Sequence, residues 1–217
     1  MKWFSGTGLA ALLALGMTTG AVAAEQQYGP GVTHIKSVVL LIARGEATAG
    51  GETSLKIAID KEANTIIGKL NGLGYAVEVA SEDGKNIQAG GSTLKVDKKL
   101  ADVQVTDYVG VIIPCMSSGN ILSGLKIVQD MHSRNLPVAA QNGGVLILAT
   151  AGVLKGRNYS IGEGFERYVK DGVFTGVGVV RDGNILTSGI CPNAAQRTGL
   201  KDGTDELIMA FADMLKK

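Results

Sequence analysis

The chain has 217 residues, of which 45% are hydrophobic and 19% charged, and its formal net charge at neutral pH is +1. This length suits one domain with a sizeable core. Basic residues form neither a stripe nor a patch interleaved with aromatic residues, which argues against nucleic acid as a partner.

The N-terminus has the pattern of a secretory signal peptide. Lys2 precedes an apolar run at 8–17, and small residues continue to Ala24. The apolar run is too short to span a bilayer. We therefore expect cleavage after Ala24, export to the periplasm and no membrane anchor in the mature chain. The predicted organisation is a signal peptide at 1–24, an extended lead-in at 25–35 and one α/β domain at 36–217.

Apolar runs and helical periodicity alternate along the rest of the chain. A polar excursion at 81–106 interrupts this alternation. The predicted strands are 37–43, 75–80, 108–113, 173–180 and 185–188, and the predicted helices are 53–70, 121–134 and 205–215.

The segment 137–157 predicts a short buried strand, an abrupt glycine-containing turn and a helix of small apolar residues. This is the plan of a nucleophile elbow, in which a tight strand-to-helix turn holds one side chain above a sheet. The residue at the apex is Asn142. Its neutral amide cannot act as a nucleophile.

The alternation of strands and helices predicts a doubly wound, mainly parallel sheet with helices on both faces. Sites in such sheets lie at the carboxyl ends of the strands. Those ends carry every candidate site residue in this chain: Glu52, Cys115, Asn142, Gly143, Gly144 and Cys191.

The chain resembles the ThiJ/PfpI family, part of the class I glutamine amidotransferase-like group, over roughly residues 36–215. Family members typically read V-A-A-I-C-H-G-P before an L-L-A-x-A-G-L-L-K-G-R-like helix. They also carry D-Y-D-A-L-V-L-P-G-G and D-G-N-L-I-T-S segments. The matching stretches here are 138–157, 107–114 and 182–188. The resemblance implies a flavodoxin-like fold and a homodimer.

The departures from the family pattern fall on the site. The family's nucleophilic cysteine aligns with Asn142, and the histidine after it aligns with Gly143. Cys115 and Cys191 stand where the family has glycines in two neighbouring turns. The family's acidic residue after the first strand is best matched by Glu52. The alternative interpretation is that Glu52 is a solvated loop residue. The resemblance implies that Cys115, Asn142 and Cys191 border one pocket.

Cys115 and Cys191 are the only cysteines. An even number in an exported chain predicts a disulfide between them. A redox pair and a relocated nucleophile are the alternatives. The chain has neither a C-x-x-C motif nor a four-ligand zinc spacing, so we expect no metal and no cofactor.

Two functions follow. The favoured one is a non-catalytic domain that binds a small ligand or a partner protein through the old pocket, where the N–H groups of Gly143 and Gly144 would hold a small anion. In a second version of this hypothesis, the turn keeps only its backbone geometry and binds nothing. The alternative is a thiol-dependent enzyme of glyoxalase or deglycase, redox or hydrolase type, which uses Cys115 or Cys191 with Glu52 as a site carboxylate.

Overall fold

The computed structural model describes residues 37–45, 50–117 and 122–216, which belong to one compact unit, 35–217. Its centre is a seven-stranded sheet in the order β10-β11-β7-β6-β1-β2-β5. Within this sheet, β10 and β11 pair antiparallel, and all the other neighbours are parallel. The strands are β1 (Val38–Ile42), β2 (Ala76–Ser81), β5 (Lys98–Lys99), β6 (Gly110–Ile113), β7 (Val138–Gln141), β10 (Val179–Asp182) and β11 (Ile185–Ser188). The predicted mainly parallel α/β fold is confirmed.

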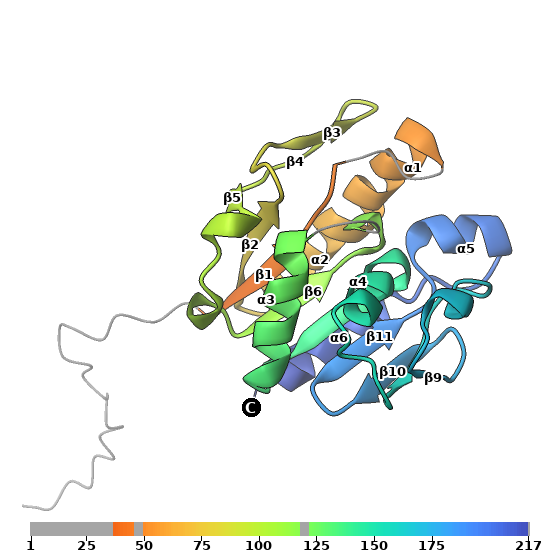
Figure 1. The fold of residues 1–217 in the computed structure, drawn as a ribbon. Coiled ribbons are helices and arrows are strands. Elements are labelled where there is room, and N and C mark those ends of the chain that lie inside the picture. Colours follow the sequence, from red (N-terminus) through yellow and green to blue (C-terminus); the bar gives the residue numbers. More distant parts are fainter. Residues whose placement is uncertain (1–36, 46–49, 118–121, 217) are drawn as a thin grey trace, which may run out of the picture. The chain divides into compact units, whose positions relative to one another are not determined.

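Helices cover both faces of this sheet (Figure 1). α2 and α6 pack on one face, and α3 and α4 pack on the other. The helices are α1 (Gly51–Ile57), a π-helix (Ala58–Ala63), α2 (Asn64–Gly72), α3 (Leu122–Ser133), α4 (Val145–Thr150), α5 (Pro192–Thr198) and α6 (Thr204–Leu215). In the part of the chain that the structure describes, no helix is long and apolar enough to cross a membrane.

The two-sided cover explains the continuous apolar runs in the sequence. In β1, Val39 and Leu41 enter one core while Leu40 and Ile42 enter the other. All four side chains are fully buried, because successive residues of a strand point to opposite faces of the sheet.

The polar excursion after β2 has structure of its own. A hairpin of β3 (Ile87–Ala89) and β4 (Ser92–Leu94) turns at Gly90 and Gly91, both of which have positive φ. β5 then adds a short edge to the main sheet. Two 3₁₀ turns, Leu100–Asp102 and Val105–Asp107, lead into β6.

The predicted strand at 173–180 is wrong as a single element. β9 (Val173–Phe174) pairs with β8 (Asn158–Tyr159) in a separate two-stranded sheet, whereas β10 joins the main sheet. Gly176, with φ of 115°, lies between them. A backbone in this conformation, which is open mainly to glycine, interrupts a strand even where apolar residues continue on both sides.

Candidate functional site

The turn at Asn142 keeps the geometry of an elbow. β7 ends at Gln141, a 3₁₀ turn spans Asn142–Gly144, and α4 starts at Val145. Asn142 has φ of 42°, in the left-handed region, which Asn tolerates better than most residues. A Cβ on Gly144 would lie 2.4 Å from the Ile113 carbonyl oxygen, so the elbow packs directly on the end of β6.

Three loops meet at the carboxyl edge of the sheet. Cys115 begins the 3₁₀ turn Cys115–Ser117 after β6, Asn142 follows β7, and Cys191 precedes α5 after β11. Since these strands are neighbours in the sheet, their following loops come together. The structure thus brings Cys115, Asn142 and Cys191 into one site.

The loop that carries Cys191 is anchored by the residue before the elbow. The buried Gln141 side chain donates to the Ile190 carbonyl at 2.8 Å and accepts from the Thr204 hydroxyl at 3.1 Å. Asn193, at the start of α5, donates to the Ser54 carbonyl at 2.9 Å. These bonds hold the backbone on both sides of Cys191.

Both cysteines are free, so the structure does not contain the predicted disulfide. The two side chains are hydrogen-bonded instead, with Cys115 as donor. The Asn142 amide donates to the Cys191 sulfur at 3.6 Å, and the backbone N–H groups of Ala194 and Asn193 also donate to it. Non-covalent donors therefore surround the sulfur that a disulfide would use.

These donors decide where negative charge resides in the pair. The Cys115 hydrogen bond, followed by those from Ala194, Asn142 and Asn193, lowers the pKa of Cys191 to about 7, although burial acts in the opposite direction. The pKa of Cys115 is raised well above its ordinary value by its hydrogen bond to Cys191, by burial and by nearby Glu62. The Cys191 thiolate is therefore the favoured charged form.

A third ionisable group, Glu62, completes the cluster, and it was missed by the sequence analysis. Glu62 lies in the π-helix and is fully buried. Its Oε1 accepts a hydrogen bond of 2.6 Å from the Cys115 backbone N–H, whereas Oε2 has no partner. Burial and the charge of Cys191 raise the pKa of Glu62 well above its ordinary value.

A signal for Glu62 does exist in the sequence. Glu62 falls between Ile59 and Ile66, both fully buried, at the i+3 and i+4 spacing of one helix face. A carboxylate on the apolar stripe of a helix is costly unless it has partners, which marks it as a candidate site residue.

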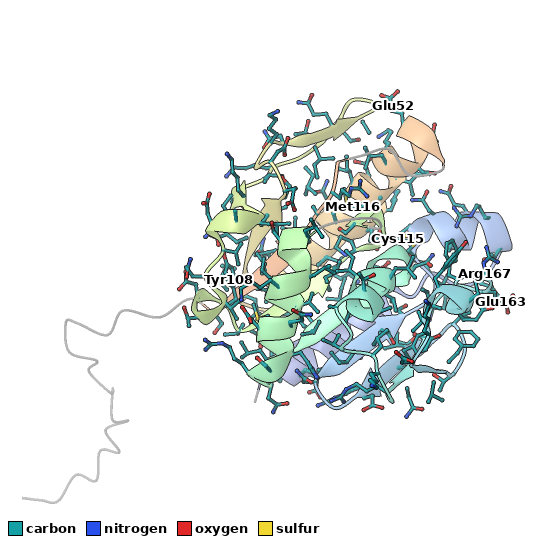
Figure 2. The ribbon with its side chains drawn as sticks, viewed as in Figure 1. Glu52, Tyr108, Cys115, Met116, Glu163 and Arg167 are labelled. Atoms are coloured by element: carbon teal, nitrogen blue, oxygen red, sulfur yellow. The ribbon has the colours of Figure 1, made fainter. Side chains whose placement is uncertain are left out.

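Glu52, the predicted site carboxylate, lies elsewhere. It is exposed in the first turn of α1, and its Oε1 accepts a hydrogen bond of 2.8 Å from the Gly90 N–H in the β3–β4 turn. Figure 2 shows it at the outer end of α1, away from Cys115. The carboxyl group that does lie beside the cysteines belongs to Glu62, ten residues further along the chain.

The N–H groups of Gly143 and Gly144, which were predicted to hold a small anion, have other surroundings in the structure. The Gly143 N–H donates to the Cys115 sulfur, so this donor already has a partner. Gly144 is buried against the end of β6. The elbow backbone thus supports Cys115, and the structure offers no free Gly143 donor for an anion.

A cavity of about 150 Å³ opens beside the cluster. Cys115 is half-buried and lines the cavity, whereas Cys191 is fully buried behind it. Its volume is close to that of a cavity that holds one benzene molecule. The other side chains at its wall include Asn142, Leu146, Phe165, Asn193 and Arg197.

Comparison with known proteins gives a consistent picture. Residues 55–196 match the sequence profile of the DJ-1/PfpI family. An uncharacterised protein of Methanocaldococcus jannaschii is 32% identical over 140 residues, which cover 60% of this chain and 67% of that protein.

Solved structures of low identity share the fold. A ThiJ/PfpI domain protein from Brachyspira murdochii superposes with a TM-score of 0.66 at 19% identity, covering 83% of this chain and 98% of that chain. Drosophila melanogaster DJ-1beta gives a TM-score of 0.58 at 21% identity, with coverage of 83% and 98%.

Proposed function

Because this chain belongs to the DJ-1/PfpI (ThiJ) family yet has Asn142 at its elbow, we propose that its chemistry resides in Cys115 and Cys191, which act as a thiol–disulfide redox pair. The observation that carries this proposal is that the two sulfur atoms lie within 4.8 Å of each other, with Cys115 in the wall of the cavity. It develops the thiol-dependent alternative of the sequence analysis.

The exposure of the two thiols assigns their roles. Cys115 faces the cavity, so it passes its thiol proton to the Cys191 thiolate and attacks one sulfur of a small substrate disulfide. This attack forms a mixed disulfide and expels the other half as a thiolate, which takes the proton from Cys191. The buried Cys191 thiolate then attacks the Cys115 sulfur and expels the second half. The protein gains one disulfide, and the substrate leaves as two thiols after protonation of both thiolates.

The surrounding groups support this sequence of steps. The Asn142 amide and the N–H groups at the start of α5 donate to the Cys191 sulfur. They stabilise its negative charge, which the resolving thiolate needs. In this proposal, the role of Asn142 at the elbow is to donate a hydrogen bond to the Cys191 sulfur.

The test is intact mass after alkylation, with glutathione disulfide as the oxidant. We expect the reduced protein to lose two hydrogens and both alkylation sites on oxidation, and to regain them with dithiothreitol. Cys191→Ser should trap one glutathione on Cys115, because the resolving thiol is missing. Cys115→Ser should react slowly, because Cys191 is buried.

Two results would overturn the proposal. If both cysteines of the wild-type protein can still be alkylated after treatment with excess glutathione disulfide, the redox proposal is wrong. A non-catalytic binding domain would then be the favoured function. Equal glutathione capture by the two single variants would contradict the assigned order of attack. Glu52→Gln, which changes an exposed carboxylate that does not line the cavity, is the matched control and should behave as wild type.

We also propose that the chain is exported to the periplasm and forms a homodimer. The support for export is the charged, apolar and small-residue pattern at 1–24, which lies outside the residues that the structure describes. An oxidising compartment would supply the disulfides that the pair needs. The mass of the protein recovered from a periplasmic extract tests cleavage after Ala24, and light scattering tests the dimer.

A further inference from the structure

We propose that the reduced site binds one divalent metal ion of borderline softness, Zn²⁺ in the first place, through Cys115, Cys191 and Glu62. One donor atom from each of the three residues lies within 4.8 Å of the others. They come from three separate segments: the π-helix, the turn after β6 and the residue before α5. No metal is expected from the sequence alone, because ligands so far apart in the chain do not form a recognisable metal-binding motif.

The donor set matches the chemistry of zinc. Two thiolates and one carboxylate bind Zn²⁺ at about 2.0–2.3 Å, which places tetrahedral ligands roughly 3.5–3.8 Å apart. The observed separations require only small side-chain movements to reach this geometry. Hard ions such as Mg²⁺ and Ca²⁺ prefer sets made of oxygen alone.

The second observation is the unsatisfied carboxylate. Glu62 is fully buried, and its Oε2 has no hydrogen-bond partner. An isolated buried carboxylate is costly, and native structures rarely leave one without a partner. A divalent metal ion between Oε2 and the two sulfurs would satisfy this atom and offset most of the negative charge of the cluster.

The neighbours of the three ligands are arranged as supports for a metal site. The Cys115 N–H fixes Glu62 through Oε1, which leaves Oε2 free to bind. The Asn142 amide and two backbone N–H groups donate to the Cys191 sulfur. Such outer hydrogen bonds orient ligands and tune metal affinity.

Three protein ligands leave a fourth position for water or a substrate group. Cys115 lines the cavity of about 150 Å³, so this position would face that space. The inference rests on the proposed function only in using the same two thiols, since a disulfide would remove two of the three ligands. Oxidation would therefore release the metal.

The experiment uses the reduced, metal-free full mature chain. We expect Zn²⁺ to bind one per chain in competition with a chromophoric chelator, and to protect both cysteines from alkylation. Co²⁺ in place of Zn²⁺ should give thiolate-to-metal charge-transfer absorption and the intense visible bands of four-coordinate cobalt. Wild-type protein that has been oxidised with glutathione disulfide should bind neither ion. This control requires no substitution in the protein.

Glu62→Gln tests the carboxylate with little change of shape, and we expect its Zn²⁺ affinity to fall at least tenfold. Glu52→Gln is the control and should leave the affinity unchanged. Far-ultraviolet circular dichroism of each variant establishes that it is folded. Absence of one-to-one binding by the reduced wild type, cobalt spectra without charge transfer, or undiminished affinity in folded Glu62→Gln would each overturn the site.

The outcomes separate the two proposals. Reversible disulfide formation without metal binding would leave the redox function standing and remove the metal site. Metal binding with no disulfide formation under excess glutathione disulfide would remove the redox function and leave the metal site standing.

Discussion

Asn142 combines a left-handed backbone with a side-chain hydrogen bond to Cys191, and two substitutions separate these roles. Asn142→Gly removes both the amide and the Cβ, whereas Asn142→Ala removes the amide but keeps a Cβ at positive φ, without the tolerance that asparagine has for this backbone conformation. We expect Ala to be less stable than Gly by about 1 kcal/mol.

Urea unfolding of the two variants under reducing conditions measures this difference from the transition midpoints at a common slope. Equal midpoints would mean that the elbow does not hold position 142 in the left-handed region.

At the scale of elements, the elbow depends on the close approach of Gly144 to the end of β6. In Gly144→Ala, the new Cβ would be 2.4 Å from the Ile113 oxygen and 3.0 Å from the Pro114 oxygen. Backbone cannot yield as a flexible side chain can, so we expect a loss of about 1–3 kcal/mol or more in unfolding free energy.

Gly68→Ala in α2 is the matched control. Apart from its own helix backbone and chain neighbours, no atom lies within 4 Å of the position that a Cβ would take there, and the φ of Gly68 is not positive. Alanine there should be neutral or stabilise the protein by up to about 1 kcal/mol. A Gly144→Ala variant as stable as Gly68→Ala would contradict the packing of the elbow on β6.

The edge of the sheet is held by a charged contact that responds to pH. Glu78 of β2 forms an ion pair of 2.8 Å with Lys98 of β5 and accepts a hydrogen bond from Tyr108, which Figure 2 labels. Burial raises the pKa of Glu78, but the hydrogen bonds from Lys98 and Tyr108 outweigh it, so the pKa lies below its ordinary value.

A carboxylate with a depressed pKa in the folded state stabilises the protein above its unfolded pKa, and this contribution is lost as the pH falls through the folded value. The pair is partly exposed, so we expect well under 1 kcal/mol. Glu78→Gln should therefore reduce the gap in unfolding free energy between pH 7 and pH 3, as measured by urea titration at both values. An unchanged gap would show that the contact contributes nothing.

At the scale of the whole molecule, oxidation of Cys115 and Cys191 would join segments 76 positions apart in the sequence. A cross-link of this kind restricts the unfolded chain, so the oxidised protein should be more stable than the reduced protein by about 2–4 kcal/mol. Thermal or urea unfolding with and without dithiothreitol measures this difference.

The double variant with Cys115→Ser and Cys191→Ser is the control, and reductant should not change its stability. Oxidised wild type that is less stable than the reduced form would indicate that the disulfide distorts the native site.

The sequence by itself determined the class of fold and the meeting of the site loops. The apolar runs of β1, β6, β7 and β11 predict strands buried on both faces, and the topology of a parallel sheet places the following loops at one edge. Asn142 at the elbow is likewise visible in the sequence, together with its consequence for the family nucleophile.

Only the tertiary structure showed which carboxylate lies beside the two cysteines. The periodicity at 53–70 predicts a continuous helix, and neither the π-helix nor the burial of Glu62 follows from local preference, because both depend on what packs against that face. The split of 173–180 has the same cause, since its two halves pair with different partners. The state of the cysteines also depends on the tertiary structure. The presence of two cysteines in the sequence predicts a disulfide, whereas the hydrogen-bond donors around the Cys191 sulfur favour a thiolate.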